Sequence, residues 1–157
     1  MYQNEEENRF PKRKSPRIKD YDYSAQNYYF VTICTHQKQC IFGDPMALNT
    51  FGVIAEKLLL EIPVHFSGVI IDKYVIMPNH IHVIFNIAEK GISLIDLIGS
   101  YKSAVTKEIH KVQPKLLIWQ KSFHDHIIRN QNSYEKIWNY IDGNPLKWNE
   151  DCFYIGK

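Results

Sequence analysis

Long hydrophobic runs are missing from this 157-residue sequence. No apolar stretch approaches the roughly 20 residues that a helix needs to cross a bilayer, so we expect no membrane association. The acidic start, residues 1–7, has no apolar centre and therefore does not fit a secretory signal. Together these absences predict a cytoplasmic protein.

Cysteine is scarce, and its pattern excludes the usual cysteine-based frameworks. Cys34, Cys40 and Cys152 are odd in number and contain no C-x-x-C pair, which fits neither a disulfide framework nor a zinc finger. A chain of this size can bury roughly 70% of the surface that its unfolded form exposes, so it needs no such staple. We expect thiols that stay reduced in the cytoplasm.

A strong excess of one charge is absent as well, since the formal net charge is +2. The charges are nevertheless distributed unevenly along the chain. Residues 9–19 carry six basic residues and no acidic one, and Arg13 and Arg17 belong to this segment. Such a segment is either an arm that contacts phosphates or a solvated, frayed terminus, and the sequence leaves both interpretations open.

Hydrophobic residues make up 45% of the chain and charged residues 23%, which excludes a disordered or fibrous protein. No repeat or low-complexity tract divides the sequence, so we expect a lead-in over residues 1–26 and one domain over 27–157. Alternating and helical hydrophobic spacings predict the order strand, helix, strand, strand, helix, strand, helix. The expected ranges are 27–35, 51–62, 69–76, 80–87, 94–112, 123–129 and 132–142.

Capping residues and a proline set the expected helix ends. Ser93 and Asn132 each begin a pattern with an acidic residue three positions later, which predicts the starts of the second and third helices. Asn49 or Thr50 should cap the first helix, and Pro63 should end it.

The first six elements follow the split βαβ, or ferredoxin-like, order. We therefore predict an α+β fold, in which an antiparallel sheet is joined by an added C-terminal helix. The first and third strands of this fold are central. Strand 80–87 should thus be buried on both faces, which suits its apolar sequence.

Two histidines share one face of strand 80–87. Side chains alternate along a strand, so His80 and His82 point to the same side. Two neighbouring imidazoles on a rigid central strand form half of a preorganised metal site. Two unrelated histidines, each satisfied separately, are the alternative. A second pair, His124 and His126, flanks a charged residue, which indicates an edge strand and suits a metal pair less well. His126 could still face the same site from a neighbouring strand.

Tyr140 lies at the edge of the buried stripe on the last helix. At about 100° per residue, it falls roughly 110° from the centre of that stripe, with Asn144 on the same side one turn later. A half-buried packing tyrosine and a phenol that reaches a metal site both fit this position.

The string from Met77 to Phe85, M-P-N-H-I-H-V-I-F, resembles the HUH motif of single-tyrosine transposases. Further blocks agree in order: residues 17–23 with 29–32, Trp119-Gln120 followed by His126 and Arg129, and Y-I-D-G-N-P at 140–145. The resemblance covers nearly the whole chain from about residue 9. The subgroup that the sequence most resembles is the REP-associated tyrosine transposases.

This resemblance implies a role for each matching residue. Tyr140 matches the nucleophilic tyrosine, and His80 and His82 match the two histidine ligands of a metal ion. In related small transposases, a side chain four residues after the tyrosine completes the metal site, and this position is Asn144. Because Pro145 follows, non-helical geometry is favoured at Asn144, which would turn its side chain elsewhere.

The implied activity is transesterification on single-stranded DNA at hairpin-forming sequences, through a 5′-phosphotyrosine. It would use Mg²⁺ or Mn²⁺ and no nucleotide cofactor. Arg129, Lys102, His126, Arg13 and Arg17 are the predicted DNA contacts. Single-stranded or hairpin DNA is the expected partner, and both a monomer and a homodimer stay open.

Three other functions remain alternatives. A non-catalytic ferredoxin-like nucleic-acid-binding module is the first, although the aromatic-rich string of RNA-binding domains is absent. A replication initiator or relaxase usually carries additional domains, for which this chain has no room. A metal-binding domain without catalysis is the third.

Overall fold

The computed structural model describes residues 27–156, so Arg13, Arg17 and the rest of the basic segment lie outside the described residues. The main sheet has four antiparallel strands in the order β4-β5-β1-β6. These strands are β1 (Asn27–Cys34), β4 (Val69–Met77), β5 (His80–Ile87) and β6 (His124–Ile128). This order is that of the ferredoxin-like fold, and the predicted α+β class is confirmed.

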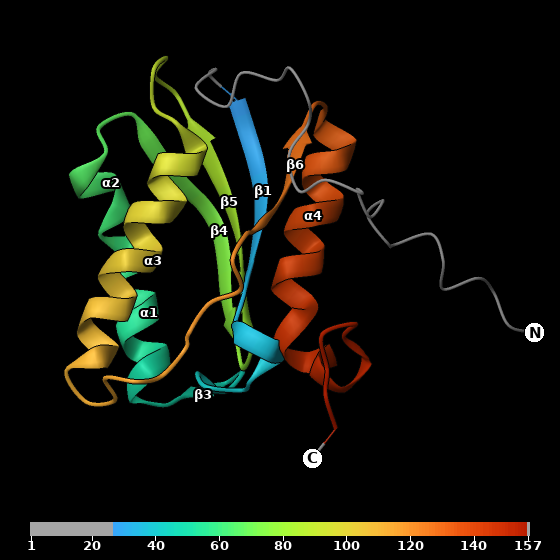
Figure 1. The fold of residues 1–157 in the computed structure, drawn as a ribbon. Coiled ribbons are helices and arrows are strands. Elements are labelled where there is room, and N and C mark those ends of the chain that lie inside the picture. Colours follow the sequence, from blue (N-terminus) through green and yellow to red (C-terminus); the bar gives the residue numbers. More distant parts are fainter. Residues whose placement is uncertain (1–26, 157) are drawn as a thin grey trace, which may run out of the picture.

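Helices cover both faces of this sheet (Figure 1). On one face lie α1 (Thr50–Leu60), the short α2 (Ile62–His65) and α3 (Leu94–His110). On the opposite face lies α4 (Gln131–Gly143), which carries Tyr140. The chain then continues into a 3₁₀ helix, η3 (Asn144–Glu150). The tyrosine helix therefore packs on the sheet face opposite to α1 and α3.

The two central strands are apolar because both of their faces are covered. On β5, every residue except Asn86 is buried, as the sequence predicts for the third strand. Ile81, Val83 and Phe85 belong to the larger core under α1 and α3. Ile84 faces the other way and packs in a smaller core with Ile137 and other residues of α4. Because side chains alternate along a strand, the side chains of His80 and His82 point to the same face as Ile84, toward α4.

Several helix ends differ from the sequence-based prediction. The first helix ends at Leu60, and Pro63 lies in the first turn of α2 instead of closing α1. Proline is well tolerated there because the first N–H groups of a helix have no partner within the helix. The cap of α4 is Asn130 rather than Asn132, and its Oδ1 accepts a 2.8 Å hydrogen bond from the Ser133 N–H.

The loop between β1 and α1 also holds elements that were not predicted. A two-stranded hairpin joins β2 (Gly43–Asp44) to β3 (Ala47–Leu48), and a 3₁₀ turn, η2 (His36–Lys38), precedes it. Gln37 and Lys38 both have positive φ angles, 51° and 55°, which non-glycine residues seldom adopt. Across residues 27–156, no helix has the length and apolarity required to cross a bilayer.

Candidate functional site

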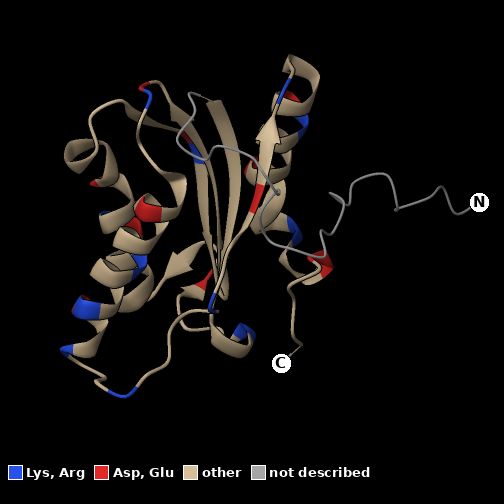
Figure 2. Cartoon of the chain, turned by 45° about the horizontal axis from the view of Figure 1, so that its top comes forward, with Lys and Arg blue, Asp and Glu red and all other residues tan. Residues whose placement is uncertain are grey.

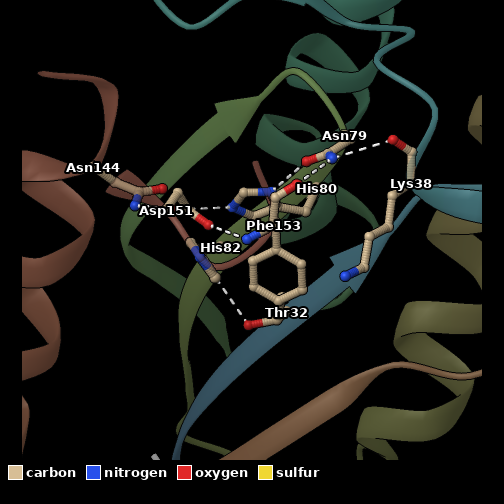
Figure 3. A network of polar contacts seen from close by, with 8 residues as sticks. All are labelled: Thr32, Lys38, Asn79, His80, His82, Asn144, Asp151 and Phe153. Atoms are coloured by element: carbon tan, nitrogen blue, oxygen red, sulfur yellow. Dashed lines mark hydrogen bonds and ion pairs between the residues drawn. The ribbon is translucent and has the colours of Figure 1, made fainter. Parts of the chain in front are cut away.

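The two histidines of β5 lie side by side on the sheet face that α4 covers (Figure 3). Their ring centroids are 4.5 Å apart, and the side chains are almost fully buried. In the β1–β5 register, Cys34 is directly opposite His80, and Thr32 is opposite His82. Both imidazoles are therefore held on the same face of a central strand, as the H-x-H spacing predicts.

Asn79 fixes the hydrogen position on His80. The Asn79 amide nitrogen donates to the carbonyl oxygens of Lys38, at 3.2 Å, and Phe153, at 2.8 Å. The Asn79 Oδ1 is then the atom 2.8 Å from the Nδ1 of His80, and an amide oxygen can only accept. Nδ1 of His80 therefore carries the hydrogen, and Nε2 keeps the lone pair that a metal ligand requires.

His82 is held in position by a hydroxyl group, which can either donate to or accept from the ring. Its Nδ1 lies 2.8 Å from the Thr32 Oγ1. Within the described part of the chain, the Nε2 atoms of both His80 and His82 are buried and have no hydrogen-bond partner. A buried nitrogen without a partner is costly, and a shared cation would satisfy both at once. The residues present therefore fit a metal site.

Burial also keeps the imidazoles neutral. It lowers the pKa of His80 to about 4, and the nearby Asp151 carboxylate opposes part of that effect. Burial also lowers the pKa of His82 well below its ordinary value, and the proximity of His80 adds to the decrease. Neutral imidazole is the form that ligates metals, so both side chains are ready to do so at neutral pH.

The segment after α4 brings a carboxylate to the same place. The Asp151 Oδ2 is 3.8 Å from the Nε2 of His80. His80, His82 and Asp151 each offer one possible ligand atom, and these three atoms all lie within 4.8 Å of one another. Sequence reasoning missed Asp151, since no spacing or periodicity connects it with the histidines, which lie far earlier in the chain.

Asn144 lies between this carboxylate and the tyrosine helix. It keeps helical angles, φ −60° and ψ −42°, so the expectation that Pro145 turns it away from helical geometry is wrong. Its side chain is buried, and its Nδ2 donates a 2.6 Å hydrogen bond to the Asp151 Oδ2. The structure thus places Asn144 at the site, where it holds the Asp151 carboxylate.

Tyr140 approaches the histidine pair from α4. Its ring centroid is 5.3 Å from that of His82 and 6.3 Å from that of Phe30. Burial raises the pKa of the Tyr140 phenol, and the Asp151 carboxylate adds to the increase. The phenol is therefore protonated at neutral pH. The other tyrosine of this stripe, Tyr134, donates its O–H to Asp72 at 3.1 Å.

The predicted DNA contacts are distributed over several elements. His126 is opposite Phe30 in the β1–β6 register, so it shares the sheet face of His82, on an edge strand as predicted. Arg129 is exposed just after β6. Lys102 lies on α3, and its ammonium donates to the carbonyl oxygens of Gln120, at 2.9 Å, and Ser122, at 3.0 Å.

Lys102 therefore fastens the loop after α3 on the far side of the sheet from the histidines. Figure 2 shows further basic positions on α3, on the loop that follows it and on α4. Within the described residues, positive charge is thus spread over both layers of helices.

The chain is similar to several known proteins. A family described as "Transposase IS200 like" matches residues 22–144. An uncharacterized protein of Haemophilus influenzae is 34% identical over a match that covers 91% of this chain and 93% of that protein.

Two solved structures share the fold. One is a REP-associated tyrosine transposase bound to a REP hairpin, with a TM-score of 0.61 and 20% identity over 84% of this chain and 74% of that one. The other is a putative transposase from Deinococcus radiodurans, with a TM-score of 0.54 and 16% identity over 81% of this chain and 97% of that one. Because the family match spans most of the sequence, from before β1 to the end of the tyrosine helix, this chain belongs to the IS200-like transposase family.

Proposed function

We propose that this transposase nicks and rejoins single-stranded DNA, with Tyr140 as the nucleophile and His80 and His82 as ligands of a divalent cation. One observation carries the proposal. The Tyr140 ring lies 5.3 Å from the ring of His82, whose buried Nε2 has no hydrogen-bond partner among the described residues. The phenol and a buried imidazole nitrogen without a hydrogen-bond partner are thus neighbours on one face of the sheet.

The reaction is an exchange of phosphate esters. The Tyr140 oxygen forms a bond to phosphorus and loses its proton, while the bond from phosphorus to the 3′ oxygen breaks and that oxygen takes up a proton. The products are a 5′-phosphotyrosine and a free 3′-hydroxyl. A 3′-hydroxyl then attacks the phosphotyrosine and restores the phenol. Each step replaces one ester by another, so no nucleotide cofactor is required.

Each residue of the site has a separate proposed role. His80 and His82 would hold the cation, which supplies Lewis-acid polarisation of the scissile phosphate when it is bound. The two imidazoles favour Mn²⁺ over Mg²⁺, since imidazole nitrogen binds the transition metal Mn²⁺ more strongly than it binds Mg²⁺. Asn79 and Thr32 keep the imidazoles in position through hydrogen bonds of 2.8 Å each. Tyr140 enters on α4 as a protonated phenol and gains from nearby positive charge when it attacks.

Hairpin-forming single-stranded DNA is the proposed substrate. The similar REP-associated transposase was solved with a REP hairpin, which supports this substrate class. Two of the proposed contacts belong to the edge-strand region: His126 lies on β6, and Arg129 follows it. Arg13 and Arg17 would add phosphate contacts from the segment outside the described residues.

A covalent adduct tests this function against a pure binding module. Wild-type protein, a labelled hairpin oligonucleotide with a single-stranded flank, and Mn²⁺ are combined and then resolved on a denaturing gel. We expect a protein–DNA adduct from wild type and from the Tyr134→Phe control, and none from Tyr140→Phe. Adduct formation by Tyr140→Phe at the wild-type yield would move the nucleophile elsewhere. DNA binding without an adduct in any variant would favour the non-catalytic module.

A further inference from the structure

We propose that the Asp151 carboxylate is the third protein ligand of the metal, and that Asn144 positions this carboxylate rather than completing the site itself. The inference rests on the proposed metal function of His80 and His82. It assigns a ligand to the segment that follows the tyrosine helix, instead of to the helix end.

The distances are those of a site close to its bound geometry. The Asp151 Oδ2 is 3.8 Å from the His80 Nε2, and the three possible ligand atoms are all within 4.8 Å of one another. Metal–ligand bonds of roughly 2.0–2.2 Å place neighbouring ligand atoms about 3.0–3.5 Å apart. A contraction of less than about 1 Å would bring Asp151 and His80 into that range.

Charge balance points the same way. The Asp151 side chain has 0% exposure, and its oxygens accept hydrogen bonds from two neutral donors, the Asn144 amide and the Phe153 N–H. Among residues 27–156, no lysine or arginine nitrogen lies within ion-pair distance of this carboxylate, and the imidazole of His80 lies 3.8 Å from it. Buried carboxylates are costly unless a cation pairs with them or a metal binds them. A divalent cation between Asp151 and the imidazoles would provide the missing positive charge.

Asn144 acts on Asp151 through its amide. The 2.6 Å hydrogen bond from its Nδ2 ends on Oδ2, the same oxygen that faces His80. The Phe153 N–H binds Oδ1 at 2.7 Å, so both oxygens are held and the carboxylate is aimed at the histidines. The Asn144 Oδ1 is also buried and has no hydrogen-bond partner within the described range. It competes only as a neutral ligand, and divalent cations such as Mg²⁺ and Mn²⁺ prefer the anionic oxygen.

Counting imidazole ligands tests the assignment directly. A histidine at position 151 would place its Nδ1 the same number of bonds from Cβ as the carboxylate oxygen that it replaces. Cu²⁺ binds imidazole well, and pulsed electron paramagnetic resonance counts the coordinated imidazoles. We expect two imidazoles in wild type, three in Asp151→His and two in the matched control Glu150→His. A folded Asp151→His protein with two imidazoles would overturn the proposal.

Metal affinity gives a second measurement that does not depend on this substitution folding. Calorimetry with Mn²⁺ should show affinity more than about 100-fold weaker for Asp151→Asn than for wild type, since groups that only orient a ligand cost 10–100-fold. Asn144→Ala should weaken Mn²⁺ about 10-fold, as a positioning residue does. Glu150→Gln should bind like wild type. Equal affinity in Asp151→Asn and wild type would contradict the proposal, as would a larger loss in Asn144→Ala than in Asp151→Asn.

These experiments separate this inference from the proposed function. If wild type shows no coordinated imidazole, the histidine pair itself is not the metal site, and the proposed function fails together with the ligand assignment. If wild type shows two imidazoles while Asp151→His also shows two, only the third ligand is wrong.

Discussion

Thr32 and His82 are joined across the central ladder, with the Thr32 Oγ1 2.8 Å from the His82 Nδ1. They are directly opposite in the β1–β5 register, so the backbone pairing sets this contact. The ring is thereby turned so that Nε2 faces the side of the sheet covered by α4. A residue of β1 thus determines how His82 on β5, a proposed metal ligand, is oriented.

Replacing Thr32 by Val should leave the strand intact and weaken the metal site. The substitution keeps the β-branched shape but leaves the buried His82 Nδ1 without its partner, which costs about 1–3 kcal/mol of stability. Mn²⁺ affinity, measured by calorimetry, should fall about 10–100-fold. Thr106→Val on α3 is the matched control and should bind Mn²⁺ normally. Unchanged affinity in Thr32→Val would show that the hydroxyl does not position the ligand.

His80→Ala and His82→Ala should each abolish tight Mn²⁺ binding and metal-dependent DNA cleavage. Either change removes one of two imidazoles held on a rigid strand and leaves too few protein ligands. His124→Ala should do neither, because His124 is an exposed residue on the edge strand β6. Calorimetry on the three variants checks the prediction, and wild-type affinity in both strand β5 variants would refute the metal assignment.

The stability of the metal-free protein should fall as the pH decreases from 6.5 toward 4. The pKa of His80 is about 4 in the folded protein and near 6.5 when the side chain is free. Between these values the unfolded chain binds a proton that the folded protein excludes, so unfolding becomes easier as the pH falls. Urea unfolding at several pH values should show this loss, and His80→Ala should show a shallower pH dependence. A parallel pH dependence in the two proteins would contradict the prediction.

The three cysteines should separate into two classes of reactivity. Cys40 and Cys152 are exposed. Cys34 is buried on β1, directly opposite His80 of β5. Burial raises the pKa of the Cys34 thiol to about 12, so its thiolate is scarce at pH 8. Ellman's reagent should therefore titrate two thiols in the native protein and three after unfolding. Cys34→Ser should give two under both conditions, and rapid reaction of all three native thiols would contradict the assigned burial.

Deleting residues 1–19 should reduce affinity for DNA without changing specificity. If half of the six basic residues contact phosphates, the log–log salt dependence should become shallower by about two units. Binding of a hairpin and of an unstructured oligonucleotide, measured at several salt concentrations, should weaken to a similar extent. A loss confined to the hairpin would mean that the segment recognises structure.

Elements with a clear local signal could be predicted from the sequence. The bounds of β5, His80–Ile87, agree with the prediction because the turn at Pro78-Asn79 and an apolar run define them. Ser93 caps α3 as expected, through a hydrogen bond from the Asp96 N–H. The predicted cap of α4, Asn132, lies two residues after the observed one, Asn130. Both asparagines suit that role, and only the backbone path selects between them.

The remaining site residues could not be predicted because their contacts are tertiary. Asp151 reaches His80 through the path of the chain after α4, which no periodicity encodes. Lys102 is predicted as a DNA contact from the sequence alone. Its hydrogen bonds to Gln120 and Ser122 could not be predicted, because they depend on the path of an irregular loop. Asn79 was assigned to a turn, and its bonds to His80, Lys38 and Phe153 were not foreseen.

The strand order has a consequence for how the chain folds. β4 and β5 are joined by the two-residue turn Pro78-Asn79, so their pairing is local and closes only a short loop. β1 instead pairs with β5, whose His82 comes 50 positions after Thr32, and with β6 still later in the chain. Closing longer loops costs more entropy and slows folding. We therefore expect the β4–β5 hairpin to acquire hydrogen-exchange protection first, and β1 to dock between β5 and β6 afterwards, which orients the His82 ring through Thr32.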